Sequence, residues 1–224
     1  MSTGQSRIFR CIFLGCLLVA FLLSAFSVHA VDWQVRVKRV LDGDTLILES
    51  GEKVRLQGID APEIGHGGAP SQYFAREAKR ELLRLVQGQT LIIKTEEISV
   101  DRYGRILAHV YLPTKESLNY LLVEKGLAFC FFYKGQNEHK FPHLLAAQRR
   151  AMDARQGFWA RILTMDAARK AYLGNKRSKR FHRLSCDFGQ RVSSKNKILF
   201  SSLKEAFYAG FAPCRTCTPW PMEK

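Results

Sequence analysis

The chain has 224 residues, which is enough for one full-sized domain and a small additional module. Its hydrophobic content of 46% allows a buried core and excludes a wholly disordered protein. The net charge of +15, from 35 Lys and Arg against 20 Asp and Glu, favours a polyanionic partner such as nucleic acid or an anionic membrane.

The first thirty residues have the layout of a secretory signal peptide. Arg7 and Arg10 precede an apolar run over residues 11–26, and small residues at 28–30 have the spacing of a cleavage site. The mostly apolar stretch 11–28 also reaches the lower length limit of a membrane-spanning helix, so an uncleaved anchor with the protein facing outward is the alternative. We therefore predict export to the periplasm or the medium.

Three strands are predicted directly after this leader. Residues 33–40 alternate between apolar and charged side chains, and residues 45–49 form a second strand after the turn signal Asp42-Gly43-Asp44. The third strand starts at Val54 and breaks at Ala61-Pro62, because proline cannot donate to a strand ladder. The three strands form a meander.

Charged residues gather where the third strand ends. Asp60 and Glu63 offer oxygens suited to a hard cation or to proton transfer. Arg55 offers a planar fork of donors that fits a phosphate. For this stretch alone, solvated charges at a strand edge are the alternative.

Three helices are predicted further along the chain. Residues 71–87, 117–125 and 143–156 carry apolar side chains at helical spacing, and strands at 91–93 and 106–112 lie between the helices. Short strands with interspersed helices predict an α+β fold, namely a small β-barrel with helical cover.

The composition changes after Leu173. Residues 174–180 combine turn formers with four cations and predict a basic linker. Residues 174–224 carry 11 Lys and Arg against 3 Asp and Glu, a net charge of +8. This end of the chain is therefore expected to contact nucleic acid, with an anionic lipid surface or a protein partner as the alternatives.

The cysteines beyond the leader indicate a metal site in a C-terminal module over residues 181–220. The patterns His182-x₃-Cys186 and Cys214-x₂-Cys217 have metal-ligand spacing and predict one structural zinc. Disulfides are the alternative in an exported chain, with Cys214 joined to Cys217 and Cys186 joined to Cys130.

Three segments taken together resemble the staphylococcal nuclease (thermonuclease) family. They are Asp42 to Thr45, Arg55 to Glu63 and Asp101 to Arg105, and the resemblance extends over about residues 32–159. It implies an OB-fold with a five-stranded β-barrel and three helices, with residues 31–173 as the nuclease domain. It also implies calcium-dependent hydrolysis of phosphodiester bonds in DNA and RNA. A catalytically weak nucleic-acid-binding or interaction module of the same fold is the alternative.

The resemblance also implies roles for individual residues. It implies that calcium is bound by Asp44, Asp60 and the backbone carbonyl of Ala61. It also implies that Glu63 acts as the general base and that Arg55 and Arg105 bind the scissile phosphate. Those implied to bind substrate are Arg102, Tyr103 and Tyr133. The tract Phe129-Cys130-Phe131-Phe132 is one residue shorter than in the family and lacks a second tyrosine, so substrate preference is left open.

The C-terminal module resembles the methyl-accepting zinc domain of the adaptive-response DNA alkyltransferase. The resemblance rests on residues 200–206 and 209–211 and on Pro213-Cys214. In that domain four cysteines bind zinc and the first accepts the methyl group, whereas His182 stands at that position here. Imidazole binds zinc but is not a thiolate nucleophile. The resemblance therefore implies the fold and zinc without methyl transfer. We expect a monomer, and the sequence leaves the preference between DNA and RNA open.

Overall fold

The computed structural model describes residues 32–94, 99–132, 139–217 and 220–223. The predicted leader and Tyr133 lie outside these residues, so neither prediction is tested by the fold. Within the described ranges, no helix combines the length and the apolar character needed to span a membrane.

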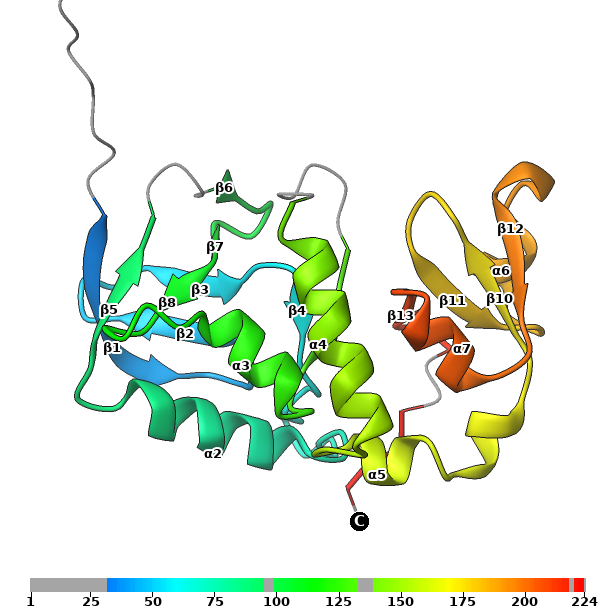
Figure 1. Cartoon of the computed structure of the whole chain (residues 1–224), viewed down its shortest axis with the longest axis horizontal. Helices are drawn as coiled ribbons and strands as arrows, with labels where there is room; N and C mark the ends of the chain where they lie inside the picture. Colours follow the sequence, from blue (N-terminus) through cyan, green and yellow to red (C-terminus); the bar gives the residue numbers. More distant parts are fainter. Residues whose placement is uncertain (1–31, 95–98, 133–138, 218–219, 224) are drawn as a thin grey trace, which may run out of the picture. The chain divides into compact units, whose positions relative to one another are not determined.

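Seven short strands form the first sheet, in the order β6-β7-β3-β2-β1-β5-β8 (Figure 1). The strands are β1 (Trp33–Val40), β2 (Thr45–Leu48), β3 (Lys53–Leu56), β5 (Thr90–Ile93), β6 (Ser99–Val100), β7 (Ile106–Ala108) and β8 (Val110–Tyr111). The first three pair antiparallel, which confirms the predicted meander. β7 pairs with β3 and β8 pairs with β5, although His109 alone separates β7 from β8. β7 and β8 are thus consecutive in the chain but lie near opposite edges of the sheet. The described strands do not form a continuous ladder that closes the sheet into a barrel.

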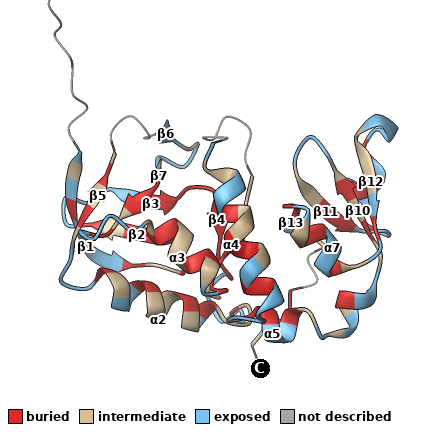
Figure 2. Cartoon of the chain, viewed as in Figure 1, coloured by how far each residue is buried: buried red, intermediate tan, exposed pale blue. Residues whose placement is uncertain are grey.

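The three predicted helices are present and cover this sheet. They are α2 (Ala75–Val86), α3 (Leu118–Glu124) and α4 (Phe141–Asp153). α3 contacts both α2 and α4, and the buried faces of the helices meet the strands in one apolar core (Figure 2). Ser117 begins α3 because its side chain accepts a hydrogen bond from the backbone N–H of Tyr120.

A second sheet, in the order β12-β10-β11-β13, forms the C-terminal region. Its strands are β10 (Tyr172–Asn175), β11 (Arg180–Arg183), β12 (Lys197–Phe200) and β13 (Ala212–Pro213), and its short helices are α6 (Asp187–Gln190) and α7 (Leu203–Tyr208). β13 runs parallel to β11, whereas the other pairs are antiparallel.

The predicted linker over residues 174–180 is instead a β-hairpin, and that prediction was wrong. Gly174 and Asn175 end β10, and the side chain of Asn175 accepts a hydrogen bond from the backbone N–H of Arg177, which closes the turn. A Cβ on Gly174 would lie 2.6 Å from the ring of Phe200, so the strand packs tightly here. The cations that indicated a linker lie around an exposed hairpin turn.

A second apolar core is shared by the two regions. Phe129 of β9 (Phe129–Cys130) and Trp159 of α5 (Trp159–Ile162) pack in one cluster with Phe181, Phe207 and Trp220. These rings meet edge to face or tilted, with centroids 4.9–6.4 Å apart. The C-terminal region therefore completes the packing of the first domain and is not an independent appendage.

Gln148 links the same two regions through hydrogen bonds. Its buried side chain accepts from the backbone N–H of Cys130 at 2.6 Å and donates to the backbone carbonyl of Phe207 at 2.6 Å. Both polar groups are thereby satisfied inside an apolar environment, where an unpaired one would be destabilising.

The last described residues return to the first domain. The backbone N–H of Tyr73 donates to the carbonyl of Pro221 at 2.8 Å, and that of Glu223 donates to the carbonyl of Ser71 at 2.8 Å. The indole N–H of Trp220 donates to the carbonyl of Tyr73 at 3.1 Å. The C-terminal segment thus fixes the stretch of chain that leads into α2.

Candidate active site and metal centre

Arg55 lies buried between two aspartates at the edge of the first sheet. Its guanidinium is 2.8 Å from Asp44 Oδ2 and 2.6 Å from Asp60 Oδ1, and it also donates to the carbonyl of Leu56 at 3.1 Å. The side chains of Arg55, Asp44 and Asp60 are 9%, 6% and 8% exposed. Solvated charges at a strand edge are thus excluded for these three groups.

The turn between β1 and β2 positions Asp44. The side chain of Asp42 accepts a hydrogen bond from the backbone N–H of Asp44 at 3.0 Å, which shapes the turn. A Cβ on Gly43 would lie 2.7 Å from the Cβ atoms of Ala61 and Ala78. Only glycine lets the turn pack this closely against α2 and against the strand end that carries the second aspartate.

Asp60 ends the two-residue strand β4 (Ile59–Asp60), which pairs with β9. The tight turn before β4 uses Gly58 at φ +80°, a conformation that favours glycine. Directly after β4, the backbone N–H of Ala61 donates to Asp44 Oδ2 at 2.7 Å. The predicted calcium ligands Asp44, Asp60 and Ala61 are thereby brought together.

Glu63 lies beside this group at the surface. Its backbone N–H donates to the side-chain oxygen of Gln72 at 3.0 Å, and its side chain is 57% exposed. The loop that follows is held by a hydrogen bond from the N–H of Gly65 to the hydroxyl of Ser71. Glu63 therefore has a fixed backbone and a carboxylate that water can reach.

Burial raises the pKa of both Asp44 and Glu63. For Asp44 desolvation is the largest cause, and Arg55 offsets part of it. For Glu63 desolvation is again the largest cause, the neighbouring Asp60 adds to it, and Arg215 and Arg55 oppose it. Burial disfavours the charged form of Arg55, but Asp44 and Asp60 more than offset this and raise its pKa. Burial, together with repulsion between neighbouring carboxylates, therefore disfavours the charged form of both acids.

The donor set fits a hard divalent cation. The groups near Arg55 are the carboxylates of Asp42, Asp44, Asp60 and Glu63, and oxygen ligands of this kind suit calcium better than zinc. Within the described residues, these carboxylates are not gathered as closely as the Cys and His group described below. An open arrangement of this kind suits a cation that keeps several water ligands.

Arg105, Arg102 and Tyr103 form a separate group in the turn before β7. Arg105 Nε is 2.8 Å from Asp101 Oδ2, Arg102 donates to the hydroxyl of Tyr103 at 2.6 Å, and both guanidinium groups lie over the Tyr103 ring. Leu107 of β7 is the register partner of Arg55, and Arg105 precedes β7 by one residue. The turn therefore leads into the strand that pairs with β3, and joint action of Arg55 and Arg105 on a substrate stays a prediction.

Two further cations at the site, Arg215 and Arg180, were not predicted from the sequence. Arg215 is 3.3 Å from Asp60 Oδ1 and 3.8 Å from Glu63 Oε1. Arg180 lies over the ring of Phe131 at 3.8 Å, and burial lowers its pKa to about 10, which leaves it charged at neutral pH. Both come from the C-terminal region, and no local motif predicts a contact across so many residues.

The four predicted zinc ligands of the C-terminal region lie close together and form a candidate metal centre. The ligand atoms of His182, Cys186, Cys214 and Cys217 all lie within 4.8 Å of one another, and His182 Nδ1 is 3.6 Å from Cys186 Sγ. Bonds of about 2.0 Å to nitrogen and about 2.3 Å to sulfur would place two tetrahedral ligands about 3.5 Å apart, so the donor set fits zinc. Burial is the main cause that lowers the pKa of His182, which favours the neutral imidazole that binds metals.

The disulfide alternative has less support in this geometry. Cys130 is buried in the apolar core of the first domain, whereas Cys186 belongs to the ligand group of the candidate metal centre. All four described cysteines are free thiols in the structure.

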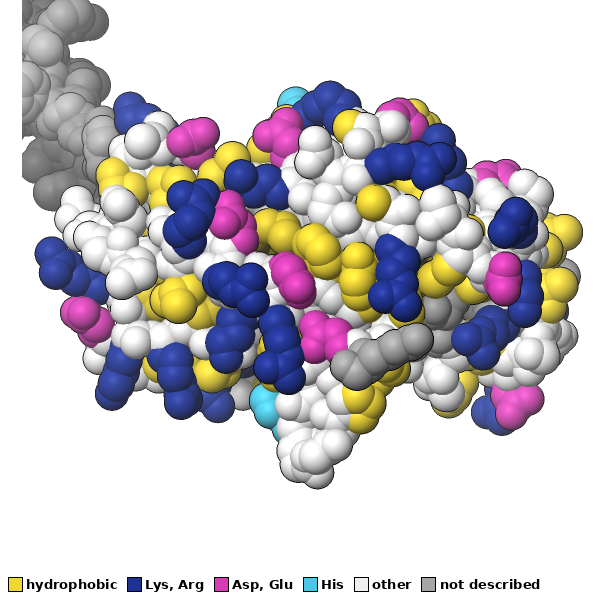
Figure 3. All heavy atoms as spheres, turned by 90° about the horizontal axis from the view of Figure 1, so that it is seen from below, with side chains coloured by type: hydrophobic (Ala, Val, Ile, Leu, Met, Phe, Trp, Pro, Cys, Tyr) yellow, Lys and Arg dark blue, Asp and Glu magenta, His cyan; other side chains and the backbone are white. Residues whose placement is uncertain are grey.

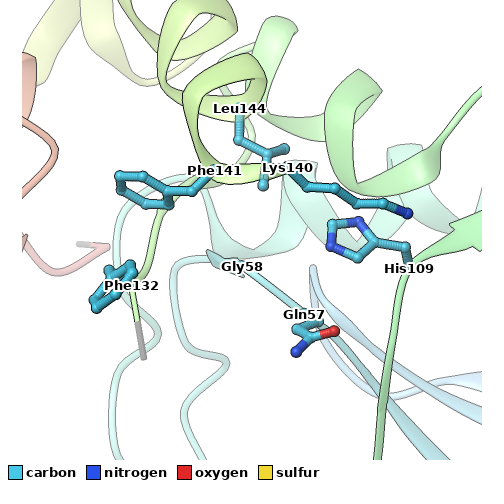
Figure 4. Close-up of a pocket in the computed structure, with 7 residues that line it drawn as sticks. All are labelled: Gln57, Gly58, His109, Phe132, Lys140, Phe141 and Leu144. Atoms are coloured by element: carbon cyan, nitrogen blue, oxygen red, sulfur yellow. The ribbon is translucent and has the colours of Figure 1, made fainter. Parts of the chain in front are cut away.

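The face drawn in Figure 3 and the small pocket near His109 add little to these sites. Figure 3 shows one face on which Lys and Arg side chains are widely spread, with acidic side chains between them. A pocket of about 10 Å³ lies between the start of α4 and His109, with Phe132 and Phe141 at one end (Figure 4). It holds about one water molecule, which is too little for a substrate.

The fold and the two sites define a class of protein: an OB-type barrel with a buried arginine between two aspartates, joined to a Cys and His metal module. Residues 53–161 match the family described as staphylococcal nuclease homologue. The thermonuclease of Staphylococcus hyicus is 32% identical over 140 residues, which cover 61% of this chain and 82% of that protein. The chain therefore belongs to the staphylococcal nuclease family.

Further similarities cover the nuclease domain and the C-terminal region. An uncharacterized endonuclease of Escherichia coli is 34% identical over 146 residues, which cover 64% of this chain and 87% of that protein. Endonuclease YhcR of Bacillus subtilis is 27% identical over 208 residues, which cover 83% of this chain and 17% of that protein. Residues 158–219 match the metal binding domain of Ada, which agrees with the zinc-site prediction.

Proposed function

We propose that this chain is a calcium-dependent endonuclease that hydrolyses phosphodiester bonds of DNA and RNA. The observation that carries the proposal is the buried ion pair of Arg55 with Asp44 and Asp60 beside the exposed carboxylate of Glu63. The names of the relatives, thermonuclease and endonuclease, support the same activity.

Each residue of the site has a chemical task in this proposal. Glu63 takes a proton from the attacking water, and its raised pKa brings it closer to the working pH of a base. Arg55 makes three described contacts with its five N–H donors, which leaves donors for a phosphate oxygen. Asp44, Asp60 and the Ala61 carbonyl would hold the cation. Calcium, when bound, supplies positive charge against the charge that develops on the phosphate.

We expect calcium to support cleavage and magnesium to support it poorly. Magnesium requires near-ideal octahedral geometry and gives up water reluctantly, whereas calcium accepts an irregular set of oxygen ligands. Digestion of supercoiled plasmid and of RNA by the full chain, after removal of trace calcium, measures this directly. Equal turnover with magnesium alone would contradict the proposed calcium site, and nucleic-acid binding without cleavage under either ion would favour the binding-module alternative.

The C-terminal region is proposed to help hold nucleic acid through its positive charge. Because it shares a core with the first domain, deletion would expose apolar surface, so the test uses substitutions. Lys176 and Arg177 are exposed at the β10–β11 turn. Replacing both with glutamine is expected to reduce the salt dependence of DNA binding by up to about two units of log–log slope, because each phosphate contact contributes about 0.9. An unchanged slope would remove this turn from the binding surface.

The metal centre is proposed to bind one structural zinc. Closure by four protein ligands leaves no open position, so zinc would stabilise the fold and perform no chemistry. Native mass spectrometry of the purified full chain should find one zinc per chain, and His182→Ala should lose it. A mass without zinc and smaller by two hydrogens per bridged pair would establish the disulfide instead.

Export is a further part of the proposal, and it rests on the layout of residues 1–30 alone. N-terminal sequencing of the protein recovered outside the cytoplasm tests it. A mature chain that starts near residue 31 would support cleavage, and an intact leader in the membrane fraction would support the anchor.

A further inference from the structure

Arg215 reaches the acidic site of the barrel from between two residues of the metal centre. It is separated from Asp60 by 155 positions in sequence, yet its guanidinium is 3.3 Å from Asp60 Oδ1 and 3.8 Å from Glu63 Oε1. Its side chain is 64% exposed, against 9% for Arg55. Arg215 therefore lies at the solvent side of the site, whereas Arg55 lies beneath it.

The backbone around Arg215 is fixed on both sides. Before it, β13 pairs with β11, Arg180 donates to the carbonyl of Pro213 at 3.0 Å, and the N–H of Cys214 donates to the carbonyl of Phe181 at 2.8 Å. After it, Cys217 Sγ accepts the N–H of Arg183 and belongs to the metal-ligand group. The backbone that carries Arg215 is thus held on both sides by the folded module.

A cavity of about 190 Å³ opens at this contact. Asp60 and Glu63 line it from the barrel, and Arg215 and Trp220 line it from the C-terminal region. It is far larger than the single-water pocket near His109, and it therefore has room for several water molecules or for a phosphate group. Its charged lining combines carboxylates with one exposed arginine.

We propose that Arg215 is a substrate-binding residue of the nuclease site and that it donates to a non-bridging oxygen of the scissile phosphate. The inference deepens the proposed function and rests on it. A guanidinium at this position has two opposite electrostatic effects. It attracts the phosphate, and it competes with a cation for Asp60. Removal of the charge should therefore weaken substrate use and tighten calcium binding at the same time.

The test compares Arg215→Gln with Arg215→Lys in the full chain. Arg36→Gln, on the exposed face of β1, is the control that removes the same charge away from the site. In saturating calcium we expect Arg215→Gln to lower kcat/KM about 10- to 100-fold, as for loss of a charged hydrogen bond, and Arg215→Lys to recover part of it. Isothermal titration without nucleic acid should show a lower Kd for calcium in Arg215→Gln and an unchanged Kd in Arg36→Gln.

Each other outcome has a defined meaning. Equal effects of Arg215→Gln and Arg36→Gln on kcat/KM would show that Arg215 acts only through the net charge of the protein, which would overturn the inference. If Arg215→Gln were more active than wild type, Arg215 would inhibit the site instead of binding the substrate, and this result would also overturn the inference. If wild type cleaves and Glu63→Gln does not, the proposed function stands whatever happens at Arg215. An inactive wild type would overturn both.

Discussion

Replacing Arg55 with lysine is expected to lower kcat/KM by about 10²- to 10³-fold, the usual loss for one electrostatic group in an active site. Lysine keeps the charge, but its single ammonium cannot make the two short contacts to Asp44 and Asp60 at 2.8 Å and 2.6 Å and also serve a phosphate. Steady-state kinetics on a DNA substrate measure the loss, and Arg36→Lys on the exposed face of β1 is the matched control.

Substitution of Arg55 should also lower the stability of the protein. Arg55→Ala leaves two buried carboxylates without their cation, and breaking such a pair is expected to lower the free energy of unfolding by about 3–5 kcal/mol. Urea denaturation of both Arg55 variants separates the two effects. A Lys variant with nearly full activity would show that the bidentate geometry is not needed, and an Ala variant with wild-type stability would show that the ion pair is not structural.

Replacing Glu63 with glutamine is expected to lower kcat by about 10²-fold or more without loss of stability. Glutamine keeps the shape of glutamate but cannot accept the proton, and general base catalysis contributes about 10²- to 10⁴-fold. Because the side chain is 57% exposed, little packing is lost. Glu49→Gln, also exposed, is the matched control. More than about a tenth of wild-type kcat in a folded Glu63→Gln variant would remove Glu63 from its role.

The pH profile of the wild type gives an independent check on Glu63. A base acts only when deprotonated, so kcat/KM should rise with pH as Glu63 loses its proton. Since burial and Asp60 raise the pKa of Glu63 above its ordinary value of 4.5, this acidic limb should lie above pH 4.5. The limb should be missing from the residual activity of Glu63→Gln.

Strands and helices whose apolar residues repeat at a regular spacing could be predicted from the sequence. Contacts between residues far apart in the sequence could not. The meander and the helices follow from alternation and from helical spacing, and α2, α3 and α4 were found where predicted. The burial of Arg55 was not predictable, because its strand alternates in a way that places it on the outer face. It becomes buried because β4 and the β1–β2 turn bring two carboxylates over it.

In the C-terminal region, too, local sequence patterns could be interpreted but contacts between distant residues could not be predicted. The four metal ligands could be predicted, because residue types and spacing alone identify a zinc motif. The hairpin at residues 174–180 was missed, because its strand is short and its turn is rich in cations. Arg215 was missed for a different reason: its partner Asp60 lies on another domain, and only the packing of the shared core brings them together.

The return of residues 220–223 to the start of α2 has a consequence for how the chain matures. Synthesis proceeds from the N-terminus, and domains commonly fold as they emerge. Here the barrel would emerge with the apolar side of β9 and α4 uncovered, because Phe207 and Trp220 come last. The segment that precedes α2 also waits for Pro221 and Glu223. A nascent chain thus has every proposed catalytic side chain long before residues 220–223 are made, so the synthesis of these residues sets the earliest moment at which the native packing around the site is complete.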